Sequence, residues 1–226
     1  MVSSPSVTYT LAIGNKNYSS WSLRPWVLMR EKGISFAEEI VSLRTDAGKA
    51  ARMARLPAGR VPCLSDGAVR VWDSLAIVEY LAERHPGVWP ADPEARAFAR
   101  SVCAEMHSGF PALRSEMSMD VRSRRPQRKR TPALLGDIAR VEALWTETRS
   151  RFGRGGPMLF GTFTAADAFY APVAFRFQTY GVSPGGEGAR YLGALLALPS
   201  MKEWAAAAEG DERLEDHDLD VLYPGD

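Results

Sequence analysis

Two neighbouring serines, Ser19 and Ser20, stand just before a segment with a helical pattern, and their hydroxyls are the first candidates for chemistry. The start of a helix leaves backbone N–H groups without partners and favours negative charge. A hydroxyl at that place can donate a hydrogen bond to a bound anion. The same pair can instead serve only as a helix cap, and the spacing alone leaves both interpretations open.

A second pair of this kind, Asp73-Ser74, opens another predicted helix. The Ser74 hydroxyl and the free N–H groups of the helix start can bind a carboxylate. The Asp73 carboxylate can contact an ammonium group. A plain helix cap is again the alternative.

Three further residues, His107, Phe110 and Arg114, follow one another at steps of three and four, and therefore share one face of a helix. We predict that they line a substrate pocket, with His107 as a candidate general base. A stripe with this spacing also fits core or interface packing, which stays open as the alternative.

The chain has two cysteines, Cys63 and Cys103, with no CxxC spacing between them. Its three histidines, His85, His107 and His217, lack the spacing of metal ligands. We therefore expect no disulfide framework and no metal site. No cysteine lies near the first serine pair, so a mixed disulfide on a protein thiol is not expected there.

Composition and charge favour a cytoplasmic globular protein. The net charge is +1, and 46% of the residues are hydrophobic. We expect neither a signal peptide nor a membrane-spanning segment, because no apolar run is long enough.

The basic segment 122–130 could contact nucleic acid, but it lacks interleaved aromatic residues. We expect a solvated loop and no nucleic-acid partner.

The chain divides by pattern into an α/β part, residues 1–87, and an all-α part, residues 94–226, joined by a proline-containing linker. A capping box, Thr164 to Asp167, marks one helix start in the second part. The acidic tail from Glu209 is expected to lie loosely on the surface or to fray. The remaining pattern predicts strands over 8–14, 36–41, 61–64 and 69–72, and helices over 22–32, 46–55, 74–84, 192–198 and 201–208.

The α/β part, with Val61-Pro62 before its hairpin, resembles the thioredoxin-like domain of cytosolic glutathione transferases, and the all-α part resembles their second domain. The segment from Ser19 to Arg24 is similar to the Ser-Ser-Cys-x-x-Arg segment of the zeta class, which includes maleylacetoacetate isomerases. In this chain Trp21 replaces the zeta-class cysteine.

The resemblance implies a bound glutathione and assigns roles to the pairs above. Ser19 is the first choice to stabilise the thiolate, with Ser20 second and Tyr18 third. A cis Val61-Pro62 bond would let the backbone of Val61 pair with the cysteinyl part of glutathione. The residues that this implies for glutathione binding are Trp21, Arg60, Val61, Pro62, Asp73 and Ser74.

The expected activity is transfer of the glutathione thiolate to a small electrophile, in a homodimer. A glutathione-dependent cis–trans isomerase of the zeta type is one alternative. A non-catalytic relative that binds ligands or protein partners is another.

Overall fold

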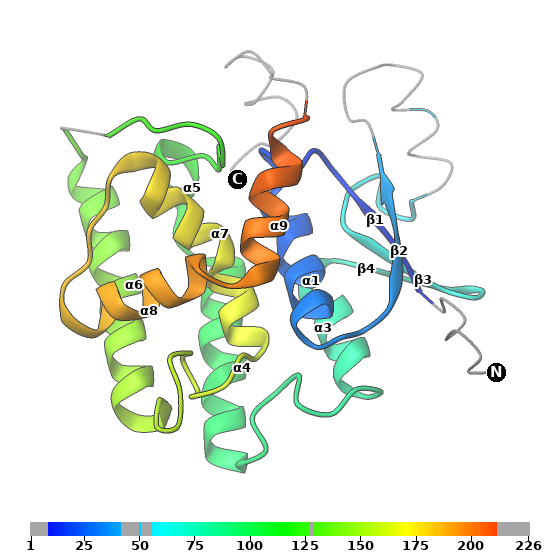
Figure 1. The fold of residues 1–226 in the computed structure, drawn as a ribbon, viewed down its shortest axis with the longest axis horizontal. Coiled ribbons are helices and arrows are strands. Elements are labelled where there is room, and N and C mark those ends of the chain that lie inside the picture. Colours follow the sequence, from blue (N-terminus) through cyan, green and yellow to red (C-terminus); the bar gives the residue numbers. More distant parts are fainter. Residues whose placement is uncertain (1–8, 42–49, 51–55, 127–128, 212–226) are drawn as a thin grey trace.

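The computed structural model describes residues 9–41, 50, 56–126 and 129–211, and it places a small sheet with helices beside a larger helical part (Figure 1). This is the predicted combination of a thioredoxin-like α/β domain and an all-α domain. Among the described residues, no helix combines the length and the apolar character needed to cross a membrane.

Four strands form one mixed sheet in the order β2-β1-β3-β4, in which β1 pairs parallel with β2 and antiparallel with β3. The predicted hairpin is confirmed, since β3 and β4 pair antiparallel. The predicted helix over 46–55 lies outside the described residues, apart from Ala50. The elements of this part are β1 Tyr9–Ile13, α1 Ser20–Glu31, β2 Phe36–Ile40, β3 Cys63–Asp66, β4 Val69–Trp72 and α3 Ser74–Ala82.

Helix α1 begins two residues earlier than the sequence predicts. Ser19 is its N-cap residue, and the Leu23 N–H donates the first helical bond to the Ser19 carbonyl at 3.3 Å. Pro25 therefore lies in the second turn rather than the first, where the missing N–H removes one helical bond. Nearly every residue from Ser20 to Met29 is buried, because α1 packs between the sheet and the helical part.

The helical part surrounds α7, a helix whose residues are almost all buried. Helix α8 begins six residues before the predicted start. Its first turn is rich in glycine, and glycine has no side chain that could contribute to a hydrophobic pattern. Gly188 allows a close approach there, because a Cβ would lie 3.1 Å from the Pro184 Cβ. The helices are α4 Pro93–Ser108, α5 Pro111–Glu116, α6 Pro132–Phe152, α7 Ala165–Tyr180, α8 Gly186–Leu196 and α9 Pro199–Ala208.

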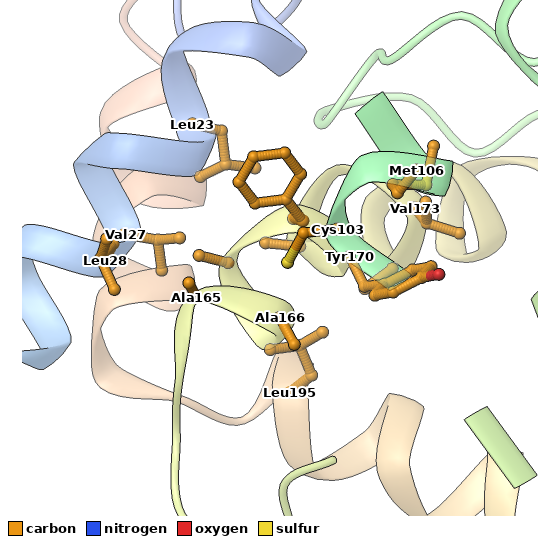
Figure 2. Packing of buried hydrophobic residues seen from close by; sticks show 14 of the residues in the cluster. Leu23, Val27, Leu28, Cys103, Met106, Ala165, Ala166, Tyr170, Val173 and Leu195 are labelled. Carbon is orange, nitrogen blue, oxygen red and sulfur yellow. The ribbon is translucent and has the colours of Figure 1, made fainter. Parts of the chain in front are cut away.

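Helices α1, α4 and α7 share one hydrophobic core across the two parts (Figure 2). Leu23 and Val27 of α1 lie toward Cys103 of α4 and Ala165 of α7 in this view. Burial raises the pKa of the Cys103 thiol well above its ordinary value. This cysteine is therefore a core residue without nucleophilic character.

The predicted capping box is confirmed at the start of α7. The Thr164 hydroxyl accepts from the Ala166 N–H at 3.3 Å, and Asp167 Oδ2 accepts from the Thr164 N–H at 2.8 Å. Asp167 Oδ1 also accepts from the Leu159 N–H at 3.0 Å. Asp167 is fully buried, and this burial raises the pKa of its carboxyl to about 6.

We predict that Asp167 makes stability depend on pH. Its folded pKa of about 6 lies above the unfolded value of about 3.9, so the folded state binds the proton more tightly. The resulting stabilisation is present below about pH 4 and is lost as the pH rises through about 6. The free energy of unfolding of the wild type minus that of Asp167→Asn should fall by about 3 kcal/mol between about pH 4 and 7. Urea denaturation across this range measures the difference.

Asp92→Asn is the matched control. Asp92 caps α4 at the surface by accepting from the Ala95 N–H at 2.8 Å, and its carboxylate stays solvated. The corresponding difference for Asp92→Asn should show no such fall. A difference for Asp167→Asn that does not change with pH would contradict the prediction.

Candidate functional site

A cavity of about 330 Å³ lies between the start of α1, the turn before β3 and the start of α3. The sequence predicts six glutathione-contacting residues from three separate segments, and the structure brings all six to this one cavity. Ala58 and Trp72 also line it and were not predicted, because neither belongs to a helix start or a motif. The predicted six are Trp21, Arg60, Val61, Pro62, Asp73 and Ser74.

Val61 and Pro62 form part of the cavity wall, and their peptide bond is cis, as the resemblance implies. Within the part of the chain that the structure describes, the N–H and C=O of Val61 have no hydrogen-bond partner. The Val61 Cγ2 and the Ser19 hydroxyl oxygen each lie 3.2 Å from the position that a Cβ on Gly14 would take. The cavity wall and the first candidate hydroxyl therefore both approach Gly14.

Ser19 is the N-cap residue of α1, but its hydroxyl does not cap the helix. It donates to Ser22 Oγ at 2.8 Å, and Ser22 Oγ also accepts from the Gly14 N–H at 3.1 Å. A hydroxyl can rotate its hydrogen, so Ser22 can donate to Ser19 and free the Ser19 hydrogen for another acceptor. This role of Ser22 was not predicted from the sequence. Its spacing of three residues from Ser19 could have indicated it, because that spacing places both side chains at the first helical turn.

All three hydroxyl candidates, Ser19, Ser20 and Tyr18, are buried, and none of them is a lining residue of the cavity. Ser20 is fully buried, and its N–H donates to the Tyr18 carbonyl at 3.0 Å. Tyr18 is 4% exposed. Ser20 directly precedes the cavity-lining Trp21, and the Ser19 hydroxyl shares a neighbour, Gly14, with the cavity-lining Val61.

Asp73 has both carboxylate oxygens engaged and a left-handed backbone, with a φ of 74°. Its Oδ1 accepts from the N–H groups of Leu75 at 2.8 Å and Ala76 at 3.4 Å. Its Oδ2 lies 3.3 Å from His107 Nε2. The hydrogen bond with His107 is the main cause that holds the pKa of the Asp73 carboxyl below its ordinary value. Asp73 therefore stays ionised beside the cavity.

Arg24 brings a buried positive charge to the same place. One of its guanidinium nitrogens donates to Ser74 Oγ at 3.3 Å. Its guanidinium carbon lies 4.1 Å from the centre of the Trp21 ring and 4.8 Å from that of Phe169. Arg24 belongs to the motif similar to the zeta-class segment, but its role could not be predicted, because no local pattern distinguishes a buried arginine.

The three predicted pocket residues do not line this cavity; they lie behind it. His107 reaches Asp73, and its ring packs edge-on against Trp21 with the centroids 5.1 Å apart. The Arg114 guanidinium lies 4.9 Å from the Trp21 ring centre and donates to the carbonyls of Met106 and Gly109. Phe110 is buried, with a left-handed backbone. His107 and Arg114 thus contact Trp21 across the two parts, and a role of the three residues in a pocket for the second substrate stays a prediction.

Within the described ranges, no group of three or more His, Cys, Asp or Glu side chains is placed to hold a metal ion. Burial raises the pKa of the Cys63 thiol, which lies in β3. The lining residues with polar side chains are Arg60, Asp73, Ser74 and the two tryptophans, Trp21 and Trp72.

Comparison with known families gives two matches that follow one another along the chain. Residues 18–84 match the glutathione S-transferase N-terminal domain, and residues 119–210 match the C-terminal domain. The first match contains every residue predicted to contact glutathione.

Among curated proteins, the chain is 37% identical over 98 residues to a probable maleylacetoacetate isomerase of Caenorhabditis elegans. That match spans 42% of this chain and 45% of the isomerase, so it covers less than half of either protein. A stringent starvation protein A homolog of Pasteurella multocida is 25% identical over 76% of both chains.

Among solved structures, a glutathione transferase homolog from Burkholderia with bound glutathione has a TM-score of 0.65 and 24% identity, over 89% of this chain and 97% of that one. A theta-class glutathione S-transferase from Xanthomonas axonopodis, also with glutathione bound, has a TM-score of 0.61 and 22% identity, over 88% and 97%. These likenesses establish the fold. Together with the two domain matches, they show that this chain belongs to the glutathione S-transferase family.

Proposed function

We propose that this protein is a glutathione transferase that binds glutathione in the cavity between α1 and α3 and activates its thiol through Ser19. The observation that carries the proposal is the convergence of three distant segments, which start at Trp21, Arg60 and Asp73, on one cavity beside Ser19. The Burkholderia and Xanthomonas structures with glutathione share this fold.

The cavity offers a partner for each polar end of the tripeptide. The backbone of Val61 can pair with the cysteinyl unit as an added strand would. The Ser74 hydroxyl and the start of α3 suit the γ-glutamyl carboxylate, with the Arg24 charge 3.3 Å behind Ser74. The ionised Asp73 suits the ammonium group, and the exposed Arg60 suits the glycyl carboxylate.

Ser19 supplies the activation in this proposal. A hydrogen bond donated to the charged sulfur contributes about 1.5–3 kcal/mol, which lowers a thiol pKa by about one to two units. The start of α1 adds a favourable field. The thiolate then attacks an electrophilic carbon, the new S–C bond forms, and the leaving group departs with its electron pair. We also expect a homodimer, a cytoplasmic location and a role in detoxification.

Two alternatives have support of their own. The similarity to the nematode isomerase favours a glutathione-dependent cis–trans isomerase, in which the thiolate adds to a double bond and leaves again. The similarity to stringent starvation protein A homologs, over three quarters of both chains, favours a ligand- or partner-binding protein without catalysis. Turnover of a maleylacetoacetate-type substrate supports the first of these alternatives. Failure of the wild type both to bind immobilised glutathione and to form a thiolate near neutral pH supports the second.

We predict that Ser19→Ala keeps glutathione bound but loses the thiolate. The pKa of the bound thiol should rise by about one to two units, because the donor to the charged sulfur is gone. At about pH 6.5, kcat/KM should fall by about tenfold or more. Thiolate absorbance in the ultraviolet, titrated against pH, measures the pKa directly.

Ser20→Ala is the control for Ser19→Ala. Ser20 is the next residue along the chain and is fully buried, whereas the Ser19 hydroxyl shares a neighbour with the cavity-lining Val61. The loss of the Ser20 hydroxyl should therefore leave the thiol pKa close to that of the wild type. If Ser20→Ala raises the pKa and Ser19→Ala does not, our choice between the two serines is wrong.

We predict that His107→Ala weakens binding of glutathione through its amino group. His107 holds Asp73 Oδ2, the oxygen that we assign to the ammonium group. Loss of one hydrogen bond to a charged group should raise the Kd of glutathione by about tenfold. Calorimetric titration with glutathione, and with an analogue that lacks the α-amino group, measures the effect.

The amine-free analogue makes this test specific. It should bind the wild type more weakly than glutathione does, and His107→Ala should not weaken it further. An equal loss of affinity for both ligands would show that His107 supports the cavity generally and does not act through Asp73.

A further inference from the structure

The turn that presents Ser19 is built around two asparagines. Asn15 Oδ1 accepts from the Asn17 N–H at 2.9 Å, and the Asn15 carbonyl accepts from the Ser19 N–H at the same distance. This is an asparagine turn, in which the side chain replaces a backbone acceptor. The backbone position of Ser19 is therefore fixed by the conformation of residues 15–17.

Asn17 ties this turn to the helical part. It is 1% exposed, and its Nδ2 donates to Asp120 Oδ1 at 2.9 Å. Its Oδ1 accepts from the Arg122 N–H at 2.9 Å, and its carbonyl accepts from the Val121 N–H at 3.2 Å. These partners lie more than a hundred residues away, between α5 and α6, so the contacts cross between the two parts of the fold.

The end of α9 reaches the same turn (Figure 1). The Asn17 N–H also donates to Asp211 Oδ2 at 3.0 Å, across 194 residues of sequence. The Trp204 indole N–H donates to the Lys16 carbonyl at 2.7 Å. The predicted loose tail is thus incorrect for residues 209–211, because Asp211 and Glu209 both have partners.

In its described residues the basic segment has no helix or strand, lies between α5 and α6 and is largely exposed, as predicted, and two of its arginines also support the same contacts. The Arg125 guanidinium lies 3.1 Å from Asp120 Oδ2. Arg122 donates to the Asp211 carbonyl at 2.9 Å and pairs with Glu209 at 3.2 Å. In this segment, Arg125 neutralises Asp120, which holds Asn17, and Arg122 holds the backbone of Asp211.

We propose that Asn17 is a positioning residue for Ser19, and that Asp120 and Asp211 hold Asn17 in place. The inference rests on the proposed function, since it concerns the hydroxyl that stabilises the thiolate. A hydrogen bond weakens steeply outside about 2.7–3.2 Å, so a small shift of the turn would remove the bond to sulfur. Asp211, which follows α9 in the chain, then affects the acidity of a thiol bound at the start of α1.

Asp211→Ala in the full chain tests the proposal. Asp211 is partly exposed, so its loss should not prevent folding. Asn17 then keeps one acceptor for its N–H, the Asn15 side chain, and the turn is less restrained. We expect the pKa of the bound thiol to rise by about half a unit or more. We also expect kcat at about pH 6.5 to fall by about threefold. The KM for glutathione should not change, because no contact of the cavity is removed.

Glu209→Ala is the matched control. It removes an acidic side chain from the same segment, and with it the pair with Arg122, but Glu209 makes no contact with Asn17. The thiol pKa should then stay at the wild-type value. Equal pKa values for Asp211→Ala and Glu209→Ala would overturn the proposal.

Asn17→Ala adds a variant closer to the serine. It should raise the thiol pKa more than Asp211→Ala does. If Asn17→Ala does not fold, the comparison of Asp211→Ala with Glu209→Ala still tests the proposal. A wild type that does not lower the thiol pKa overturns the proposed function, and this inference with it. A wild type that does lower it, with Asp211→Ala unchanged, overturns this inference alone.

Discussion

Burial of helix α1 on nearly every side is the constraint on which the rest of the structure depends. Its residues from Ser20 to Met29 are almost all buried, because the sheet lies on one side and α7 on the other. A helix in this place has almost no solvated face, so a shift of the helix would disturb packing contacts on every side. Its N-terminus, with Ser19, must therefore lie at the junction of the two parts, where polar groups from both can reach it.

The same burial explains Arg24 and Trp21. An arginine on a buried helix is costly unless its charge is compensated. Arg24 has the Trp21 and Phe169 rings within 5 Å and the Ser74 hydroxyl at 3.3 Å. A tryptophan face attracts a guanidinium, and Arg114 lies near the same ring. Trp21 thus has a physical role that the zeta-class cysteine at this position could not fill.

The sequence predicted the parts of the site that depend on local pattern. Serines before helices, a Val-Pro pair before a hairpin and the capping box at Thr164 are all recognisable within a few residues. The contacts of His107 with Asp73 and of Asn17 with Asp120 are not, since each joins polar residues far apart in the chain. Nothing local distinguishes a histidine that pairs across the fold from one in a substrate pocket. For the same reason, nothing local predicts that Arg122 pairs with Glu209 or that Arg124 donates to Gln178.

The source of any reactive sulfur follows from the cysteines. The chain has only Cys63 and Cys103, both are buried, and burial raises the pKa of both thiols. Neither lines the cavity, and tryptophan stands where the zeta class has its cysteine. A thiolate at this site must then come from the ligand and be stabilised by a hydrogen-bond donor. Under the proposed function, catalysis reduces to whether Ser19 can turn its hydrogen from Ser22 toward that sulfur. The contacts among Gly14, Ser22 and Ser19 permit this rotation of the hydroxyl, because Ser22 Oγ still accepts a hydrogen bond from the Gly14 N–H when Ser19 turns away.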